Sequence, residues 1–449
     1  MSTRRALLTS GGMAAILATG RFPLIGGAAA QDRYAKYKGQ TIVINYPALP
    51  TFDATEKLFA DFTKETGIKI ERDKMQYLRM KDKQLLELGK PQGDYDIVTI
   101  GGWWKTEYVA KKLIDPLEPY FANAAIADPN YDIADIITPY REHFLVGGPR
   151  TYLPGPGAKL YAMPFGTETS VLGYRKDILA KHDIKPPVTY DELIAACRLV
   201  KQKESGMSGV TSRGQTGHQI TTALMFHMTP HDGKVFDENW RVALTREPAE
   251  KAATALRALL DTAPPGVASF GFGEMLNAFL QGQTAFYLDS ITVFGPAQDE
   301  ARSKIAGKVG YAIHPKAVRH AGSLGGFGIS IPSNARNKDA AFLFMQWITN
   351  KANDLRIVLN GGNAGRWSTL DQPDAVKKYP VEYPILKECL KVADLDWRPL
   401  IPEWDDISQR VIGLPMGEMA AGKLSPKDAL AAAAPQAEAV AKAAGYLKS

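Results

Sequence analysis

Two carboxylates are the residues of this sequence best suited to chemistry on a small molecule. Glu168 and Asp289 each end an apolar segment typical of a β-strand. A carboxylate accepts two hydroxyl hydrogen bonds at once, which suits the vicinal diol of a sugar or polyol. Two acids can also form the catalytic pair of a glycosidase, in which their separation decides the chemistry. The sequence does not give that separation, so ligand binding and glycoside hydrolysis both stay open.

Aromatic residues supply a second set of candidates. Trp103 and Trp104 follow two glycines in a loop at the end of a predicted strand. The flat face of Trp packs against the C–H groups of a sugar ring or polyol chain. Neighbouring residues of an extended chain point to opposite sides, so we expect at most one of the two to face a ligand. Arg366 and Trp367 follow the glycine-rich loop 361–365, where the backbone can approach a ligand closely.

Signatures of catalysis and of cofactor binding are missing from the sequence. There is no G-x-S-x-G and no H-E-x-x-H motif. Residues 417–423 approach a phosphate-binding loop, but Leu424 stands where Ser or Thr would bind magnesium, and Ser425 is better interpreted as a helix cap. The seven His residues lack metal spacing, and no cofactor or metal is predicted. Cys197 and Cys389 could pair in an oxidising compartment or remain buried thiols.

The first thirty residues predict an export signal. Arg4 and Arg5 precede a weakly apolar, Gly- and Ala-rich stretch without acidic residues, and small residues favour cleavage after Ala30. Paired arginines are typical of the twin-arginine route, and Arg21 and Pro23 interrupt the stretch before it could span a membrane. Loss of three arginines lowers the net charge from +6 to +3 (6 − 3), which is too weak to indicate nucleic-acid binding. We therefore predict a protein of the periplasm.

The mature chain alternates between strand and helix patterns. Its length of about 419 residues (449 − 30) exceeds a single core, so two lobes are expected. Strands are predicted at 41–46, 68–70, 96–100, 285–288 and 328–332. Helices are predicted from Asp53, as the cap, to Gly67, and at 75–89, 190–203, 248–261, 338–350 and 429–444. The alternation predicts α/β lobes with parallel strands, in which ligands bind beyond the carboxyl ends of the strands.

Several segments, taken in order, resemble the extracellular solute-binding proteins that serve ATP-driven sugar importers. The run from Leu160 to Ser170, continued through 174–179 and 186–193, resembles the hallmark stretch of that family. Further likenesses lie at 94–98, 282–289, 325–332 and 337–341. Together they cover essentially the whole mature chain.

A narrower likeness is to the polyol branch of that family, of the sorbitol and mannitol type. It rests on 213–214, 236–240, 264–269 and 271–272. The sequence departs from that branch at 103–104, 166–169 and 325–328, which leaves the particular ligand open between sugar, polyol and sugar derivative.

The resemblance implies an α/β fold of the periplasmic-binding-protein type, with the ligand in a cleft between two lobes. Lobe one would comprise 31–166 with 321–365, and lobe two 167–320 with 366–449. Crossover strands would lie near 164–169 and 322–328. Such a receptor is not an enzyme. It delivers its solute to transmembrane permease subunits, and we expect it to act as a monomer.

The predicted site collects residues at strand ends and crossovers. Trp103 or Trp104 would stack on the ligand together with Phe52. The hydroxyl acceptors would be Asp53, Glu168 and Asp289. Donors would be Arg213, Arg366 and the backbone at Gly325 and Gly326, with Thr167 and Trp367 beside them. The rival hypothesis is a secreted carbohydrate-active enzyme that uses Glu168 and Asp289. A receptor for a polyamine or peptide fits less well, because a polyamine site needs several acids and no arginines.

Overall fold

The computed structural model describes residues 33–147 and 154–447. The predicted export signal lies outside the described residues. One mixed sheet runs through the molecule in the order β2-β1-β3-β10-β6-β8-β7, with β9 beside β6 and β11 beside β10. Its strands are β1 Thr41–Pro47, β2 Lys69–Met75, β3 Ile97–Gly101, β6 Met163–Arg175, β7 Ser208–Thr211, β8 Thr284–Ser290, β9 Val309–Ala312, β10 Gly322–Ser330 and β11 Ala393–Asp394. Two short strands, β4 Leu145–Val146 and β5 Lys159–Leu160, pair with each other in a separate sheet.

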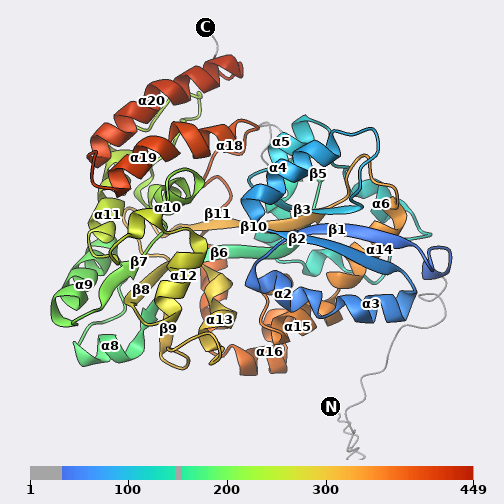
Figure 1. The fold of residues 1–449 in the computed structure, drawn as a ribbon, viewed down its shortest axis with the longest axis horizontal. Helices are drawn as coiled ribbons and strands as arrows, with labels where there is room; N and C mark the ends of the chain where they lie inside the picture. Colours follow the sequence, from blue (N-terminus) through green and yellow to red (C-terminus); the bar gives the residue numbers. More distant parts are fainter. Residues whose placement is uncertain (1–32, 148–153, 448–449) are drawn as a thin grey trace, which may run out of the picture.

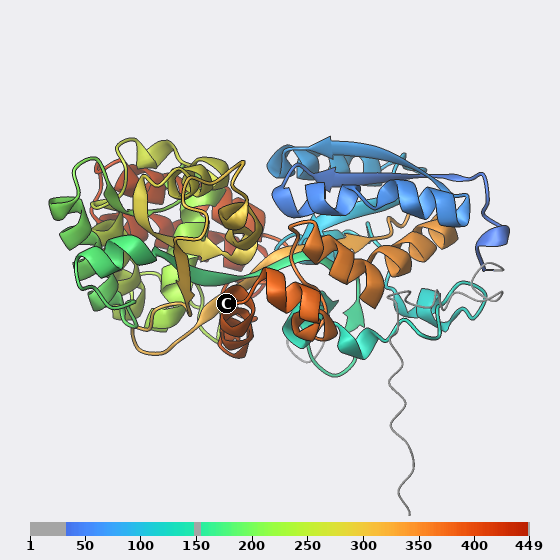
Figure 2. The ribbon, with the colours of Figure 1, turned by 90° about the horizontal axis from the view of Figure 1, so that it is seen from below.

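Two lobes are visible in Figures 1 and 2, joined by the long strands β6 and β10. The first lobe contains β1, β2 and β3, and the second contains β7, β8 and β9. Residues 163–169 of β6 pair with β10, while residues 170–175 pair with β8 and β9. Strand β10 also pairs with β3. The two strands therefore belong to both lobes, as the resemblance implies for crossover strands.

Helices cover the faces of the sheet in both lobes (Figure 1). The first lobe carries α2 Pro50–Glu56, α3 Phe59–Thr66, α4 Tyr77–Leu88, α5 Lys105–Ala110, α6 Glu118–Ala122, α7 Thr138–His143, α14 Lys338–Ile348 and α15 Lys351–Leu359. The second carries α8 Lys176–Lys181, α9 Tyr190–Lys203, α10 His218–Met228, α11 Glu247–Leu260, α12 Phe272–Leu280, α13 Phe294–Gln298, α19 Gly413–Ala420 and α20 Pro426–Ala443. The remaining helices are α16 Pro373–Lys378, α17 Glu382–Lys391 and α18 Trp404–Asp406, which a π-helical turn at Ile407–Val411 follows.

Local signals explain several helix ends. The capping box of Thr189 and Glu192 is formed in full at α9, and Ser425 caps α20 as predicted. Gly67 ends α3 with a φ of 75°, a conformation that glycine adopts without strain. The prediction that Asp53 caps its helix is wrong. Pro50 begins α2 three residues earlier, because a proline suits the first helical position, and Asp53 lies inside the helix.

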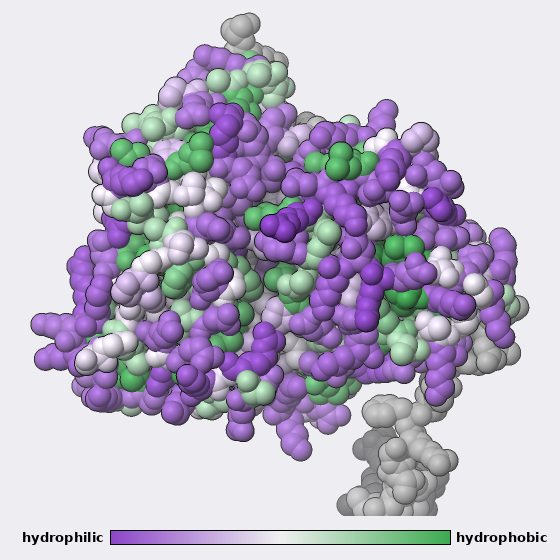
Figure 3. All heavy atoms as spheres, viewed as in Figure 1, coloured by the Kyte–Doolittle hydropathy of each residue, from purple (hydrophilic) through white to green (hydrophobic). Residues whose placement is uncertain are grey.

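The two cysteines do not form a disulfide. Cys197 and Cys389 are both free and buried, so the buried-thiol interpretation is confirmed. Burial raises the pKa of the Cys389 thiol to about 12, which makes it unreactive at neutral pH. No helix within 33–147 and 154–447 is long and apolar enough to cross a bilayer. On the face that Figure 3 shows, hydrophobic side chains form small separate patches within a mainly hydrophilic surface.

Candidate ligand-binding site

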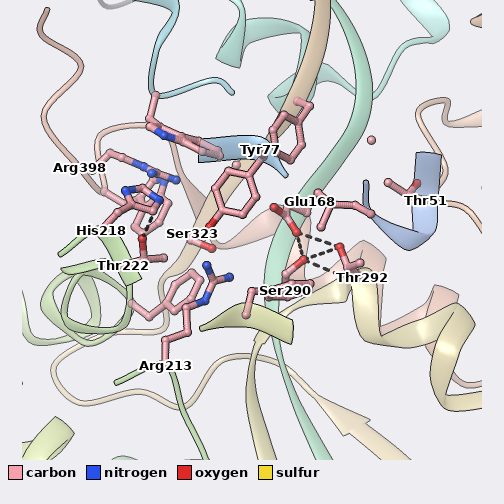
Figure 4. A pocket seen from close by; sticks show the side chains of 18 residues that line it. Thr51, Tyr77, Glu168, Arg213, His218, Thr222, Ser290, Thr292, Ser323 and Arg398 are labelled. Atoms are coloured by element: carbon pink, nitrogen blue, oxygen red, sulfur yellow. Dashed lines mark hydrogen bonds between the residues drawn. The ribbon is translucent and has the colours of Figure 1, made fainter. Parts of the chain in front are cut away.

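A cavity of about 50 Å³ lies where the two lobes meet the crossover strands (Figure 4). That volume holds a few water molecules, so the enclosed space is small. Its walls come from both lobes, from β6 and β10, and from the segment after β11. The lining residues are Leu49, Thr51, Tyr77, Trp103, Gly166, Glu168, Arg213, His218, Thr222, Phe226, Phe272, Ser290, Thr292, Ser323, Gly325, Phe327, Trp397 and Arg398.

Glu168 reaches the cavity from the middle of β6. Its carboxylate accepts hydrogen bonds from the hydroxyl of Ser290 and, at 2.9 Å, from that of Thr292. No Lys, Arg or His among the described residues forms an ion pair with it. Burial within the protein raises the pKa of Glu168 to about 7, against the opposing effect of the Arg213 charge. Glu168 is thus a hydrogen-bonding acid that titrates near neutral pH and has no cationic partner.

Arg213 enters the cavity from the loop before α10, and a buried acid neutralises it. Its Nε and Nη2 donate to the Asp289 carboxylate at 2.8 and 2.6 Å. Its Nη1 donates to Gln219 Oε1 at 3.2 Å, and Gln219 Nε2 donates to the Tyr77 hydroxyl of the first lobe at 2.6 Å. Asp289 is only 1% exposed and does not line the cavity, in contrast to its predicted role as a hydroxyl acceptor. Its two oxygens are engaged in orienting Arg213.

Arg398 is a second guanidinium in the cavity wall, and it has no such partner. It is 4% exposed, and it lies 3.8 Å from the centre of the Trp397 ring and 5.0 Å from that of Trp103. Its Nε is buried without a hydrogen bond, and no described residue forms an ion pair with it. Burial lowers the pKa of Arg398 to about 9, partly opposed by the nearby charge of Glu168. The side chain is therefore still a cation at neutral pH.

Aromatic rings form much of the remaining wall. Trp103 lines the cavity and stacks on the His218 ring of the other lobe, with centroids 5.4 Å apart and planes 23° apart. Phe226 and Trp397 stack with centroids 5.3 Å apart. Trp104 is fully buried and does not line the cavity, so one Trp of the pair faces it. Burial keeps the pKa of His218 well below its usual value, so this ring is neutral.

Three other predicted residues lie behind or beside the cavity. Phe52 is buried against Phe165 and Phe327 in the first lobe, while its neighbour Thr51 lines the cavity. Asp53 lies at the surface and pairs with the Lys74 ammonium at 2.6 Å. Thr167 is buried, and its carbonyl accepts a hydrogen bond from Asn363 at 3.0 Å. None of the three has a side chain on the cavity.

The predicted donors Arg366 and Trp367 also lie elsewhere. Arg366 is 1% exposed and donates to the carbonyls of Thr349, Tyr131 and Asp132 at 2.7, 3.0 and 2.8 Å. Trp367 Nε1 donates to Thr138 at 3.4 Å. The pair therefore anchors the segment 131–138 of the first lobe.

The two glycines of β10 differ in what they do. Gly325 lines the cavity, and a Cβ there would meet Arg398 Nη2 at 3.4 Å. Gly326 has a φ of 86°, and a Cβ there would lie 2.5 Å from the Gly166 carbonyl oxygen. This glycine permits the close contact of β10 with β6 at the register shift between 326 and 328. It contributes to the geometry of the crossover rather than to the cavity wall.

Four important lining residues were missed by reasoning from the sequence: Tyr77, His218, Trp397 and Arg398. Two of them begin the helices α4 and α10, and the other two lie in the C-terminal segment after β11, far in sequence from the motifs. One signal was available: Trp397 and Arg398 stand just before Pro399, which disfavours a helix at this point and indicates a loop. Trp397 Nε1 donates to the Leu324 carbonyl of β10 at 2.5 Å, which fixes the segment beside the crossover.

The chain belongs to the bacterial extracellular solute-binding proteins, whose family model matches residues 22–354. It is 27% identical over 392 residues to the mannitol-binding protein of Pseudomonas aeruginosa, covering 82% of this chain and 85% of the relative. It is 26% identical over 445 residues to a probable amino-acid ABC transporter periplasmic-binding protein of Sinorhizobium fredii, covering 94% of both.

A solved structure agrees in fold along most of the chain. The ABC transporter solute-binding protein of Agrobacterium radiobacter, in complex with ribitol, aligns with a TM-score of 0.81 and 25% identity. The alignment covers 90% of this chain and 99% of that one. The expected two-lobed α/β fold of solute-binding proteins is thereby confirmed.

Proposed function

We propose that this protein is the substrate-binding receptor of an ABC importer and that it captures a polyol or sugar in the cavity between its lobes. The observation that carries the proposal is the composition of the cavity wall. Hydroxyl groups of Thr51, Thr222, Ser290, Thr292 and Ser323 form the wall together with aromatic rings, one acid and two guanidinium groups. Such walls offer hydrogen bonds for hydroxyls and flat surfaces for C–H groups. The mannitol and ribitol named for the similar proteins support the same ligand class.

Closure of the lobes accounts for capture in this proposal. Tyr77 and Trp103 of the first lobe meet Gln219 and His218 of the second. The buried ammonium of Lys81 in α4 also pairs with Asp405 near the C-terminal helices at 2.8 Å. A ligand that touches both lobes favours the closed arrangement, because in the open arrangement it would keep its contacts with only one of them.

We propose the division predicted from the sequence, 31–166 with 321–365 and 167–320 with 366–449, with one amendment. The hydrogen bonds of Arg366 to Tyr131 and Asp132 support placing the start of the last segment with the first lobe.

The rival hypothesis of a glycosidase requires a second acid in the cavity. Glu168 is the only carboxylate among the described residues that line the cavity. Asp289 is held by Arg213 and is buried behind it. A glycosidase needs one acid on each side of the scissile bond, and this arrangement does not provide the second.

An amino acid is the second candidate ligand. Glu168 and Arg398 carry opposite charges and have no ion-pair partner, so they could hold the ammonium and carboxylate groups of a zwitterion. One similar protein is named for amino-acid transport. The five Ser and Thr hydroxyl groups of the wall favour a polyhydroxylated ligand over an amino acid, because they can exchange hydrogen bonds with ligand hydroxyls at several points.

Location and partners complete the proposal. We infer that residues 1–30 direct export by the twin-arginine route and are removed, so that a monomeric receptor works in the periplasm and docks on permease subunits. Lysine replacement of both Arg4 and Arg5 tests the route. It should leave precursor in the cytoplasm, whereas normal export of this variant would favour the general pathway.

A melting-temperature screen tests the ligand class. The purified mature chain is heated with erythritol, ribitol, mannitol, glucose, gluconate and a set of amino acids. A bound ligand stabilises the native state, and at high concentration this stabilisation grows with the logarithm of the ratio of free ligand concentration to Kd. We expect the polyols to give the largest shifts. A shift with amino acids alone would replace the polyol proposal, and no shift with any compound would contradict the receptor.

A further inference from the structure

We infer that Glu168 and Arg398 act as a pair of opposite charge filters, which makes the receptor specific for ligands without net charge. The inference rests on the proposed function, since it describes how the same cavity selects among polyhydroxylated solutes.

The charge inventory of the cavity supports the inference. Three lining side chains are ionic, namely Glu168, Arg213 and Arg398. The Asp289 carboxylate binds Arg213 through two hydrogen bonds and cancels its charge locally. His218 is neutral and is held by hydrogen bonds to Ser408 and Thr222. Two groups are left without an ion-pair partner within the described residues: the acid Glu168, which is negative above its pKa of about 7, and the cation Arg398.

The two unpaired groups are separate from each other. The carboxylate oxygens of Glu168 and the guanidinium nitrogens of Arg398 are more than 4.0 Å apart, so the two side chains do not form an ion pair. In Figure 4 Arg398 lies at the left of the group of lining side chains and Glu168 near its middle, with the Tyr77 ring between them. Each group thus faces its own part of the cavity, and a ligand chain that fills the space meets both.

Arg398 is built to remain unpaired by protein. Its guanidinium is positioned by the rings of Trp397 and Trp103, and not by a carboxylate. Gly325 leaves room beside its Nη2, because a Cβ at this position would already lie in van der Waals contact with that nitrogen, at 3.4 Å. A buried cation is costly when nothing compensates it, so its N–H groups gain most from ligand oxygens. Glu168 is the complementary case, because both of its described donors are neutral hydroxyls.

An uncharged polyol satisfies both ends without adding charge, since its hydroxyls donate to Glu168 and accept from Arg398. An anionic analogue gains at Arg398 but brings a like charge into the space shared with Glu168. A cationic analogue gains at Glu168 but brings a like charge into the space shared with Arg398. Like charges in a poorly solvated cavity repel strongly, which disfavours both analogues relative to the neutral compound.

Three probes with the same six-carbon chain test the inference: D-glucitol, its carboxylate D-gluconate and its amine D-glucamine. Affinities are measured by calorimetry for the wild type, Glu168→Gln and Arg398→Gln at about pH 8, between the pKa values of Glu168 and Arg398, about 7 and about 9, so that both side chains are mainly charged. We expect the wild type to prefer glucitol to both ions by about 10-fold or more, in line with one charge-assisted hydrogen bond. Glu168→Gln should shift the preference toward gluconate by a similar factor, and Arg398→Gln should shift it toward glucamine.

The surface pair of Arg336 and Asp94 provides matched controls. These residues lie 3.0 Å apart, with side chains 52% and 60% exposed. Arg336→Gln and Asp94→Asn make the same changes of net charge outside the cavity and should leave all three affinities unchanged. Melting temperatures of the two cavity variants confirm that they are folded.

The outcomes separate this inference from the proposed function. Equal losses for all three probes in both variants would overturn the charge filter while leaving a polyol receptor. So would a wild type that prefers gluconate or glucamine, or one that binds mannitol or ribitol but none of the three probes. A wild type that binds no polyol or sugar would overturn the proposed function and the charge filter with it.

Discussion

Replacing Asp289 with Asn distinguishes between two roles for this carboxylate. If Asp289 binds ligand, the substitution costs affinity and leaves stability unchanged. The structure instead makes it the sole ion-pair partner, among the described residues, of a buried guanidinium. Both of its oxygens accept from Arg213, at 2.6 and 2.8 Å, and one also accepts from the Ser290 backbone at 2.8 Å. We therefore expect the variant to lose stability first.

The expected size follows from burial. Asp289 and Arg213 are 1% and 7% exposed, so removing the acid leaves a guanidinium that water reaches poorly. Breaking a buried pair in this way costs about 3–5 kcal/mol. For roughly 420 residues that unfold together, an unfolding entropy of about 2.1 cal/mol/K per residue converts this to a fall of about 3–6 °C in the melting temperature.

Calorimetric melting of the ligand-free protein measures the effect. Asp406→Asn is the matched control, because Asp406 also binds an arginine, Arg410, through two hydrogen bonds, at 2.9 and 2.7 Å. Both side chains of that pair are about half exposed, so its loss should leave the melting temperature nearly unchanged. Equal melting temperatures for Asp289→Asn and the wild type, together with a large loss of affinity, would refute the structural role.

Three further predictions follow from buried groups of the same cavity and core. Glu168→Gln should weaken polyol binding by about 10- to 100-fold. The free energy of unfolding at about pH 8 should stay equal or rise, because folding disfavours the charged form of Glu168, whose pKa is raised to about 7. A clear loss of stability at that pH would contradict this. Trp103→Ala should cost both affinity and about 3–5 kcal/mol of stability, since the ring is 7% exposed, and unchanged melting would show that the side chain does not pack as described. Lowering the pH from about 7.5 to about 5.5 should reduce the free energy of unfolding by about 3 kcal/mol, as denaturant titration can measure. Burial keeps the pKa values of four histidines below the unfolded value of 6.5, so the unfolded chain takes up more protons and stability is lost as the pH falls; they are His143, His218, His227 and His314. The raised pKa values of Glu168 and Asp354, about 7 and about 6, act in the opposite direction and offset about half of the loss. Stability that stays constant or rises over this interval would contradict the burial of these rings.

Signals that lie within a few residues predicted the elements well. The capping box at Thr189 and Glu192 depends on a local turn, and it gave α9 with both ends correct. The helix beginning at Asp53 was placed three residues late, because a proline at the first helical position competes with an acidic cap. The crossover strands could be expected near 164–169 and 322–328 from the family resemblance, although β6 and β10 extend beyond those ranges.

Site residues were harder, because a side chain's partner decides its role. Arg213 and Asp289 were both candidates, but only their mutual hydrogen bonds reveal that one carboxylate serves the other residue. Arg366 follows a glycine-rich loop, as a binding residue can, yet it satisfies carbonyls of a distant segment. Arg398 reaches the cavity only because β11 pairs with β10, a contact between residues about seventy apart that no local pattern encodes.

Calorimetric titration of the mature protein, refolded to remove any bound solute, with mannitol and ribitol tests the central claim most directly. The account predicts saturable binding of at least one polyol at a single site, and a loss of about 10-fold or more in affinity for Glu168→Gln. Binding of an amino acid without binding of any polyol or sugar would contradict it, as would polyol binding that Glu168→Gln leaves unchanged.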